Sequence, residues 1–368
     1  MLTEDNILKN EERAIFALRS LYQRYGYERY KMSRFEEYEL YVRNKDFLVS
    51  DEVITFTDRN GRLLALKPDV TLSIIKNTVD RPGVVEKQYY NENVYRIDPG
   101  THSFKEIMQA GLECVGDLSG YEIGEVVLLA VKSLALIGEQ YVLDISHMGL
   151  ISAVLEQSGL SSGGKEQALV CFRQKNAHEL SELCQAEQVS VQNQRKLLAM
   201  IDCSGSPREV YETLLPLLTA EPERQALEEL YGLCRILASS GFEQAVRVDF
   251  SVGNDMKYYS GVVFKGYLAG IPTSVLSGGQ YDKLLRKMDR TSSAIGFAIY
   301  VDLLERLERE TDSVDVDTVV LHDGTVDPAK LVAAAENAAK SGSVLVTTML
   351  PTGRTWRNLV RFENGEAI

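Results

Sequence analysis

The sequence has few of the residues that build metal centres and disulfide frameworks. Its five cysteines lie scattered at positions 114, 171, 184, 203 and 234, without a CxxC pair, and only four histidines occur among 368 residues. An odd number of isolated cysteines is typical of reduced thiols rather than of disulfides or a zinc site. The P-loop and dinucleotide-binding fingerprints are also missing. We therefore expect no metal, no cofactor and a cytoplasmic location.

Long hydrophobic runs are missing as well. The first residues, MLTEDNILKNEERA, lack the apolar segment of a signal peptide. No later run approaches the ~20 apolar residues that span a membrane. The formal net charge of −13 disfavours a protein that binds nucleic acid through a broad basic surface, although a local basic patch remains compatible with it. Neither a membrane nor a nucleic acid is expected as a partner.

The apolar pattern predicts an α+β fold made mostly of antiparallel strands. Helical spacing covers residues 10–26 and 121–138, and a hairpin is predicted around Asp58-Arg59-Asn60-Gly61. Alternation over residues 84–98 and 104–116 predicts two strands that pair in antiparallel fashion.

The sequence changes character near residue 150. From 150 to 242 it is helical with Gly/Ser breaks, and strand-like sequence resumes at AVRVDFSVG and continues to about residue 279. We expect helices over YDKLLRKM and AIGFAIYVDLLERLERE, then a linker and a short β-α-β tail from about residue 317. The expected domains are a core (1–149 and 243–312), a helical insertion (150–242) and a C-terminal α/β tail (313–368).

The stretch KEIMQAGLECVGD, residues 105–117, predicts a strand with two unlike faces. One face is apolar, whereas Gln109, Gly111 and Glu113 place an amide, a bare backbone and a carboxylate in line on the other. Alone, such a face is more often solvated than part of a binding site. Its interpretation as a pocket floor depends on residues elsewhere in the chain.

Six segments follow one another in an order typical of one enzyme family. They are LKPDVT (66–71), VYRID (94–98), QAGLE (109–113), KYYSGVVF (257–264), GGQYD (278–282) and AIGFAIYVDLL (294–304). Together they resemble the catalytic core of histidyl-tRNA synthetase, a class II aminoacyl-tRNA synthetase. The resemblance spans roughly residues 10–310 and implies an antiparallel sheet flanked by helices, with the helical block in the place of that family's insertion domain.

The residues that surround the amino acid in that family are matched here. Asp69 and Thr71 fit the acidic residue and threonine of a motif like RPEGT, which the resemblance assigns to the α-amino group of the substrate. Gln109 and Glu113 fit a ligand-binding glutamine and glutamate four residues apart. This set suits free histidine, because an ammonium group favours a carboxylate and a hydroxyl, and an imidazole N–H favours a carboxylate or amide oxygen.

Three further residues complete the expected histidine site. Tyr258 and Tyr259 fit the tyrosine pair of LDYYTG, and because consecutive residues of a strand point to opposite faces, we expect only one of them to line the pocket. Arg96 fits the motif 2 arginine. An ion pair of Arg96 with Asp98 or another acidic residue is an equal alternative.

The residues that serve ATP in the family are largely lost. Its catalytic arginine in VRGLDYY aligns with Asn254, and its motif 3 arginine in GLERL aligns with Leu303 in YVDLL. A second arginine of motif 2 is matched only by Ser103 or Lys105. Adenylation relies on positioned cations, and removing one such donor typically raises the barrier by ~3–4 kcal/mol. We therefore expect no enzymatic activity.

A paralogue within the family shows this combination, namely the regulatory subunit of ATP phosphoribosyltransferase in histidine biosynthesis. The resemblance implies a non-catalytic subunit that binds free histidine and that the short-form catalytic subunit requires for activity and feedback control. It also implies a homodimer, formed through a region that includes FEEYELYV (35–42), within a hetero-oligomer. The alternative is a truncated histidyl-tRNA synthetase-like ligase that forms an adenylate, and an RNA-binding module is a weaker one.

Overall fold

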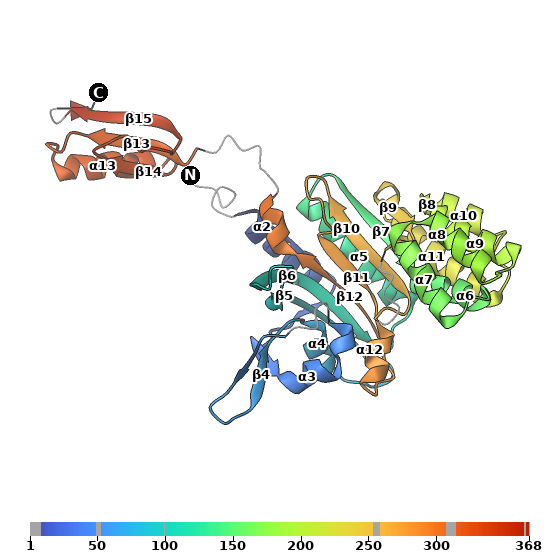
Figure 1. The fold of residues 1–368 in the computed structure, drawn as a ribbon. Helices are drawn as coiled ribbons and strands as arrows, with labels where there is room; N and C mark the ends of the chain where they lie inside the picture. Colours follow the sequence, from blue (N-terminus) through green and yellow to red (C-terminus); the bar gives the residue numbers. More distant parts are fainter. Residues whose placement is uncertain are drawn as a thin grey trace. The chain divides into compact units, whose positions relative to one another are not determined.

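The computed structural model describes residues 9–48, 53–98, 100–252, 258–306, 314–363 and 366–367 (Figure 1). The chain divides into two compact units, of which the larger is Ala14–Leu307 and the smaller combines Met1–Arg13 with Glu308–Ile368. Among the described residues, no helix combines the length and the apolar character needed to cross a membrane.

A nine-stranded sheet forms the centre of the larger unit, in the order β1-β5-β6-β12-β11-β10-β7-β9-β8. All neighbouring pairs are antiparallel except β1–β5 and β7–β9. The strands are β1 (Glu28–Arg29), β5 (Val85–Ile97), β6 (Phe104–Gly116), β7 (Tyr141–His147), β8 (Ser204–Gly205), β9 (Val246–Asp249), β10 (Val262–Leu268), β11 (Leu276–Gln280) and β12 (Ser293–Tyr300). The predicted antiparallel pairing of the strands near 84–98 and 104–116 is confirmed.

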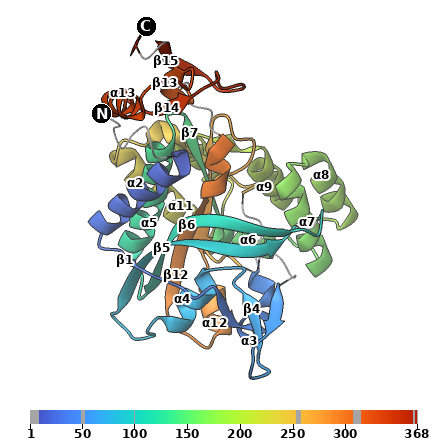
Figure 2. The same ribbon diagram turned by 90° about the vertical axis from the view of Figure 1, so that its left-hand side faces the viewer.

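Two helices pack against one face of this sheet, α2 (Asn10–Arg24) and α5 (Gly120–Ile137) (Figures 1 and 2). Helix α5 begins with a capping box in which Ser119 and Glu122 satisfy free backbone N–H groups. The hydroxyl groups of Tyr22 and Ser133 lie 3.0 Å apart and join the two helices inside the core. The apolar stripes of both helices therefore seal this face and leave the opposite face of the sheet free for a binding site.

A small three-stranded sheet and short helices adjoin the opposite face. The order of the sheet is β2-β4-β3, and β3–β4 is the predicted hairpin, with Gly61 at a φ of 79° in its turn. The elements are β2 (Phe35–Glu37), α3 (Tyr38–Arg43), η1 (Lys45–Phe47), β3 (Thr55–Thr57), β4 (Leu63–Leu66), α4 (Thr71–Asn77) and α12 (Asp282–Lys287). Because α4 starts shortly after β4 ends, residues 67–70 lie in a short turn beside the large sheet.

The segment from 148 to 239 is helical, and only the two-residue strand β8 interrupts it. Its helices are α6 (Met148–Gln157), α7 (Ser162–Gln174), α8 (Ala177–Ala186), α9 (Val191–Asp202), α10 (Pro207–Leu214) and α11 (Glu221–Ser239), and the short η2 (Glu243–Ala245) follows. Serine caps the N-termini of α7, α9 and α10, in agreement with the Gly/Ser breaks of the sequence. The limits of the expected insertion domain stay a prediction.

The smaller unit contains a four-stranded sheet in the order β14-β13-β15-β16 and one helix. The elements are β13 (Val316–His322), α13 (Pro328–Ala339), β14 (Val344–Thr347), β15 (Trp356–Glu363) and β16 (Glu366–Ala367). Strands β13 and β14 are parallel, as the expected β-α-β tail requires, and β15 adds a further parallel strand. Half of the expected linker ETDSVDVD (310–317), namely residues 310–313, lies outside the described residues.

One predicted helix is wrong. Of AIGFAIYVDLLERLERE (294–310), residues 294–300 belong to strand β12, Val301–Arg306 form the 3-10 helix η3, and residues 307–310 lie outside the described residues. Strand β12 lies between β6 and β11 near the middle of the sheet, and most of its residues are buried. A strand covered on both faces is apolar at nearly every position, so its periodicity does not distinguish it from a buried helix.

Candidate functional site

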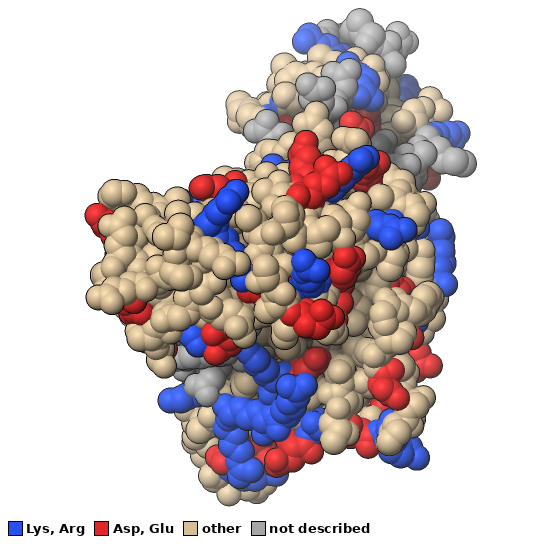
Figure 3. Space-filling model, turned by 90° about the vertical axis from the view of Figure 1, so that its right-hand side faces the viewer, with Lys and Arg blue, Asp and Glu red and all other residues tan. Residues whose placement is uncertain are grey.

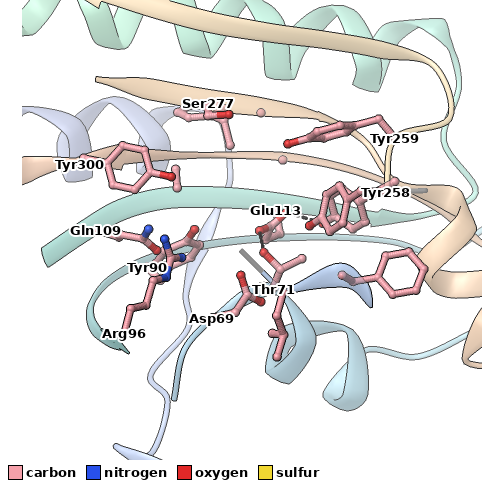
Figure 4. Close-up of a pocket in the computed structure, with 17 residues that line it drawn as sticks. Asp69, Thr71, Tyr90, Arg96, Gln109, Glu113, Tyr258, Tyr259, Ser277 and Tyr300 are labelled. Atoms are coloured by element: carbon pink, nitrogen blue, oxygen red, sulfur yellow. Dashed lines mark hydrogen bonds between the residues drawn. The ribbon is translucent and has the colours of Figure 1, made fainter. Parts of the chain in front are cut away.

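A cavity of about 170 Å³ opens on the sheet face that α2 and α5 leave free (Figure 4). All seven residues of the expected histidine site line it: Asp69, Thr71, Arg96, Gln109, Glu113, Tyr258 and Tyr259. The other lining residues are Phe47, Leu48, Tyr90, Ser277, Gly278, Tyr281, Gly296, Phe297, Ala298 and Tyr300. The structure thus brings the set together from β4–α4, β5, β6 and the segment before β10, and its role in binding stays a prediction.

Strands β6 and β12 form the floor of the cavity. Glu113 pairs with Gly296, and Gly111 pairs with Ala298, so the polar face of β6 lies beside small residues of β12. A Cβ atom at Gly111 would lie 2.6 Å from the hydroxyl oxygen of Tyr90. The bare backbone at Gly111 therefore lets the hydroxyl end of the Tyr90 side chain lie close to the floor.

The Glu113 carboxyl group is buried and held from two sides. Its Oε1 atom accepts a hydrogen bond of 2.7 Å from the Thr71 hydroxyl, and its Oε2 atom accepts one from the Tyr281 hydroxyl. Burial raises the pKa of Glu113 to about 8, although both hydrogen bonds act in the opposite direction; the charge of Asp69 raises the pKa further. Glu113 is thus mostly neutral at pH 7 in the empty cavity.

Asp69 lies just before the start of helix α4. Its Oδ1 atom accepts a hydrogen bond of 2.9 Å from the Leu72 N–H, and the residue lines the cavity. Burial raises the pKa of Asp69, while the Leu72 N–H and the Arg96 charge oppose this shift. The two acidic groups of the cavity therefore both favour a cationic ligand that would restore their ionised forms.

Arg96 carries the only positive charge among the described residues that line the cavity. Its side chain is buried, and its Nε atom donates a hydrogen bond of 3.0 Å to the Pro68 carbonyl oxygen. The alternative partner considered for it, Asp98, instead accepts hydrogen bonds from Lys105 and from nearby backbone N–H groups. Arg96 and Asp69 attract each other without a direct ion pair.

The expectation for the consecutive tyrosines was wrong, because both Tyr258 and Tyr259 line the cavity. They lie in an irregular segment before β10, so the alternation of a strand does not apply to them. Their rings meet edge to face with centroids 4.6 Å apart, and Tyr258 also approaches Phe47 and Tyr281 with centroid distances of 5.8 and 5.7 Å. Aromatic rings thus enclose one end of the cavity.

Sequence reasoning missed several of the lining residues. Tyr281 lies within the quoted motif GGQYD, and Tyr90 lies an even number of positions from Arg96 on the same strand. Both signals were available, because residues of a strand separated by an even number share a face. Gly296 and Tyr300 could not have been found while their segment was assigned to a helix.

Of the residues expected at the positions of the family's ATP-binding arginines, Leu303 and Lys105 do not line this cavity. Leu303 lies in η3 and packs against the main core, and Lys105 is engaged by Asp98. Asn254 lies outside the described residues. In the described part of the chain, no cluster of three or more His, Cys, Asp or Glu side chains suits a metal ion.

Many known proteins are similar to this chain in sequence or in structure. The sequence model of the histidyl-tRNA synthetase family matches residues 5–304. The ATP phosphoribosyltransferase regulatory subunit of Alkaliphilus metalliredigens is 27% identical over 76% of this chain and 72% of its own length. That of Geobacillus kaustophilus is 29% identical over 92% of this chain and 86% of its own length.

Solved structures confirm the predicted α+β, class II synthetase-like fold. An ATP phosphoribosyltransferase regulatory subunit/histidyl-tRNA synthetase from Bacillus halodurans aligns with a TM-score of 0.76 and 22% identity, over 98% of this chain and 96% of that one. Histidyl-tRNA synthetase from Nostoc aligns with a TM-score of 0.69 and 16% identity, over 93% and 83%. The ATP phosphoribosyl transferase (HisG:HisZ) complex from Thermotoga maritima aligns with a TM-score of 0.63 and 20% identity, over 79% and 97%.

Proposed function

The chain belongs to the histidyl-tRNA synthetase family, and we propose that it is a regulatory subunit of ATP phosphoribosyltransferase in histidine biosynthesis that binds free histidine in the cavity described above. The first curated relatives are named ATP phosphoribosyltransferase regulatory subunits. One observation supports the histidine site above others: the described lining of a small cavity combines two carboxyl groups, Asp69 and Glu113, with a single arginine, Arg96.

This charge distribution suits a small zwitterion. We place the α-amino group at Asp69 and Thr71, and the α-carboxylate at Arg96, whose guanidinium matches a carboxylate in shape and charge. An imidazole N–H group then faces Glu113, whereas the Gln109 amide lies beside Arg96, at the end that holds the α-carboxylate (Figure 4). The tyrosine rings at the Glu113 end supply flat apolar surface for the imidazole ring.

The same cavity is poorly equipped to activate an amino acid with ATP. Transfer of a nucleotidyl group needs several positioned cations around the phosphates, and Arg96 is the only cation among the described lining residues. The position aligned with the motif 3 arginine is Leu303, which offers neither charge nor a hydrogen bond. This supports a non-catalytic role over the adenylate-forming ligase.

We propose the short-form catalytic subunit of ATP phosphoribosyltransferase as the partner. The structurally similar chain from Thermotoga maritima is part of a two-component complex, HisG:HisZ. We also propose a homodimer through the region of residues 35–42, where the Phe35 ring is 47% exposed and meets the Phe56 ring, 39% exposed, edge to face. Exposed apolar side chains in a group are typical of interaction surfaces. The cytoplasmic location inferred from the cysteines stays a prediction.

Three measurements on the full chain test the function. Free L-histidine should raise the melting temperature, because a ligand of the native state stabilises it, whereas D-histidine and L-lysine should not. No histidine-dependent ATP–pyrophosphate exchange should occur. A short-form catalytic subunit should co-purify with the chain. The factor by which that subunit changes the affinity of the chain for histidine should equal the factor by which histidine changes the affinity between the two subunits. Exchange at synthetase-like rates would instead establish the ligase.

RNA binding is the weaker alternative. The net charge of −13 opposes it, although Figure 3 shows Lys and Arg side chains gathered in one area low on the displayed face. Retention of the chain on structured RNA at physiological salt would favour this alternative.

A further inference from the structure

The residues that strand β12 directs into the cavity change abruptly in size. Gly296, Ala298 and Tyr300 are two positions apart, so they share one face of the strand, and all three line the cavity. Gly296 places no side chain in the cavity, Ala298 places only a methyl group there, and Tyr300 places a full aromatic ring. Strand β12 therefore forms both the floor of the cavity and one of its end walls.

Tyr300 lies at the end of the cavity that carries the positive charge. It pairs with Gln109 of β6, and Figure 4 shows its ring on the same side as Gln109 and Arg96, away from Tyr258. Its backbone is fixed on the other side, because its N–H donates a hydrogen bond of 2.9 Å to the Val275 carbonyl oxygen. The ring is thus carried by a central strand rather than by a loop.

The small volume of the cavity agrees with an end wall at Tyr300 that keeps the cavity short. Sites for drug-sized ligands usually enclose roughly 300–1,000 Å³, whereas this cavity encloses about 170 Å³. A single amino acid is in the appropriate size range, and an amino acid joined to a second group is not.

We propose that the Tyr300 ring determines the specificity of the cavity for an unmodified α-carboxylate. The ligand ends where its carboxylate meets Arg96, and the ring occupies the space into which a carboxyl substituent would extend. Esters, peptides and nucleotide-linked forms of the amino acid are excluded by this wall, whatever their side chain. This inference rests on the proposed histidine site and adds to it the residue that distinguishes free histidine from histidine joined through its carboxyl group.

Such discrimination matters to a feedback sensor. Inside a cell, histidine occurs also in peptides and as aminoacyl groups, and a sensor of supply must respond to the free amino acid alone. A steric wall provides this exclusion without additional polar contacts, because overlap with a fixed aromatic ring is costly in a packed site.

The test compares two ligands by calorimetric titration of the full chain: L-histidine and the dipeptide L-histidyl-glycine, which extends the carboxyl group. The measured quantity is the ratio of the dipeptide Kd to the histidine Kd, which cancels any general weakening of the site. We expect Tyr300→Gly and Tyr300→Ala to lower this ratio by ~10-fold or more relative to the wild type. The matched variant Tyr300→Phe keeps the ring and should leave the ratio unchanged.

The outcomes separate this inference from the proposed function. If the wild type does not bind L-histidine, the proposed site itself fails. If it binds histidine and both small variants keep the wild-type ratio, the end-wall role of Tyr300 is overturned. A fall of the ratio in Tyr300→Phe would also overturn it, because the hydroxyl group rather than the bulk of the ring would then control access. Two small variants are included so that misfolding of one does not decide the result.

Discussion

Gly296 lies directly opposite Glu113 in the antiparallel pair of β12 and β6, and a Cβ atom at Gly296 would lie 1.7 Å from the Oε2 atom of Glu113. The same Cβ atom would lie 2.6 Å from the Leu112 carbonyl oxygen, so neither the side chain nor the backbone offers room. The missing side chain at Gly296 is therefore what gives the buried carboxyl group its place between Thr71 and Tyr281.

Replacing Gly296 by alanine should displace the Glu113 carboxyl group and disrupt its two hydrogen bonds. We expect Gly296→Ala to abolish stabilisation by L-histidine and to lower the free energy of unfolding by roughly 1–3 kcal/mol, as is usual for an overpacked interior. Thermal melts with and without histidine measure both effects. Gly232→Ala on α11 is the control for histidine protection, since its added methyl group would meet no atom within 4 Å beyond its chain neighbours and the adjacent backbone of its own helix. Unchanged histidine protection in Gly296→Ala would contradict the assigned role of Glu113.

The sequence identified the seven proposed ligand-binding residues but not the arrangement that holds them. Glu113 was found because its strand alternates and because a family motif includes it. Gly296 was not, because its contact with Glu113 exists only once β12 lies beside β6. Strand register between distant segments depends on tertiary packing, which no local pattern records.

The raised pKa of Glu113 predicts that histidine binding releases a proton. The empty cavity holds Glu113 mostly neutral below pH 8, since burial raises its pKa to about 8. A bound imidazole N–H and ammonium group favour the ionised form, so affinity should rise with pH, by roughly fivefold between pH 7 and pH 8. Calorimetric titration in buffers of different ionisation enthalpy should detect close to one proton released per histidine at pH 7.

The same shift affects the stability of the empty protein. The usual pKa of this group is 4.5, and in the folded protein it is about 8. Between these two pH values, Glu113 is ionised in the unfolded chain but protonated in the folded one. The contribution of Glu113 to the free energy of unfolding is therefore largest below pH 4.5, and this contribution is lost as the pH rises through 8. Glu113→Gln should remove both this loss and the proton release. Glu106→Gln, the same change on an exposed part of β6, should leave both as in the wild type. Proton release that persists in Glu113→Gln would assign it to another group.

Asp69 should supply the attraction for the α-amino group of the ligand. Asp69→Asn keeps an oxygen for the Leu72 N–H and so preserves the start of α4, but it removes the charge. Loss of a charge-assisted hydrogen bond of about 1.5–3 kcal/mol weakens binding by roughly 10- to 100-fold. The Kd for histidine measures the effect, and Asp58→Asn in the exposed hairpin turn is the matched control. Equal affinities of Asp69→Asn and the wild type would place the ammonium group elsewhere.

Two local features illustrate where physical reasoning from the sequence stops. Tyr258 and Tyr259 were assigned to a strand, but they lie in an irregular segment, and both line the cavity; Tyr258 packs against Phe47 and Tyr281 there. The run AIGFAIY was assigned to a helix because a strand buried on both faces lacks the alternation that reveals a strand. In both cases the tertiary surroundings, which the local pattern does not record, decided the outcome.

The helical segment holds a buried ion pair that should control its stability without affecting the histidine cavity. Lys196 of α9 lies 2.8 and 3.0 Å from the two carboxylate oxygens of Glu223 of α11, and both residues are almost fully buried. Glu223 also accepts hydrogen bonds of 3.0 Å from the Thr219 and Ala220 N–H groups before α11. Lys196→Met would leave a buried carboxylate without its cation, at a cost of roughly 3–5 kcal/mol in the free energy of unfolding.

The double variant Lys196→Met/Glu223→Gln tests the origin of that cost. The glutamine amide oxygen still accepts a hydrogen bond from the backbone at the start of α11, and no unpaired charge remains. If the cost of Lys196→Met comes from the unpaired carboxylate, the double variant should be more stable than the single one in urea denaturation. If the pair acts mainly through packing of the lysine chain, both variants should unfold at the same urea concentration. Neither variant should change the histidine Kd under conditions where it is folded, because neither residue lines the cavity.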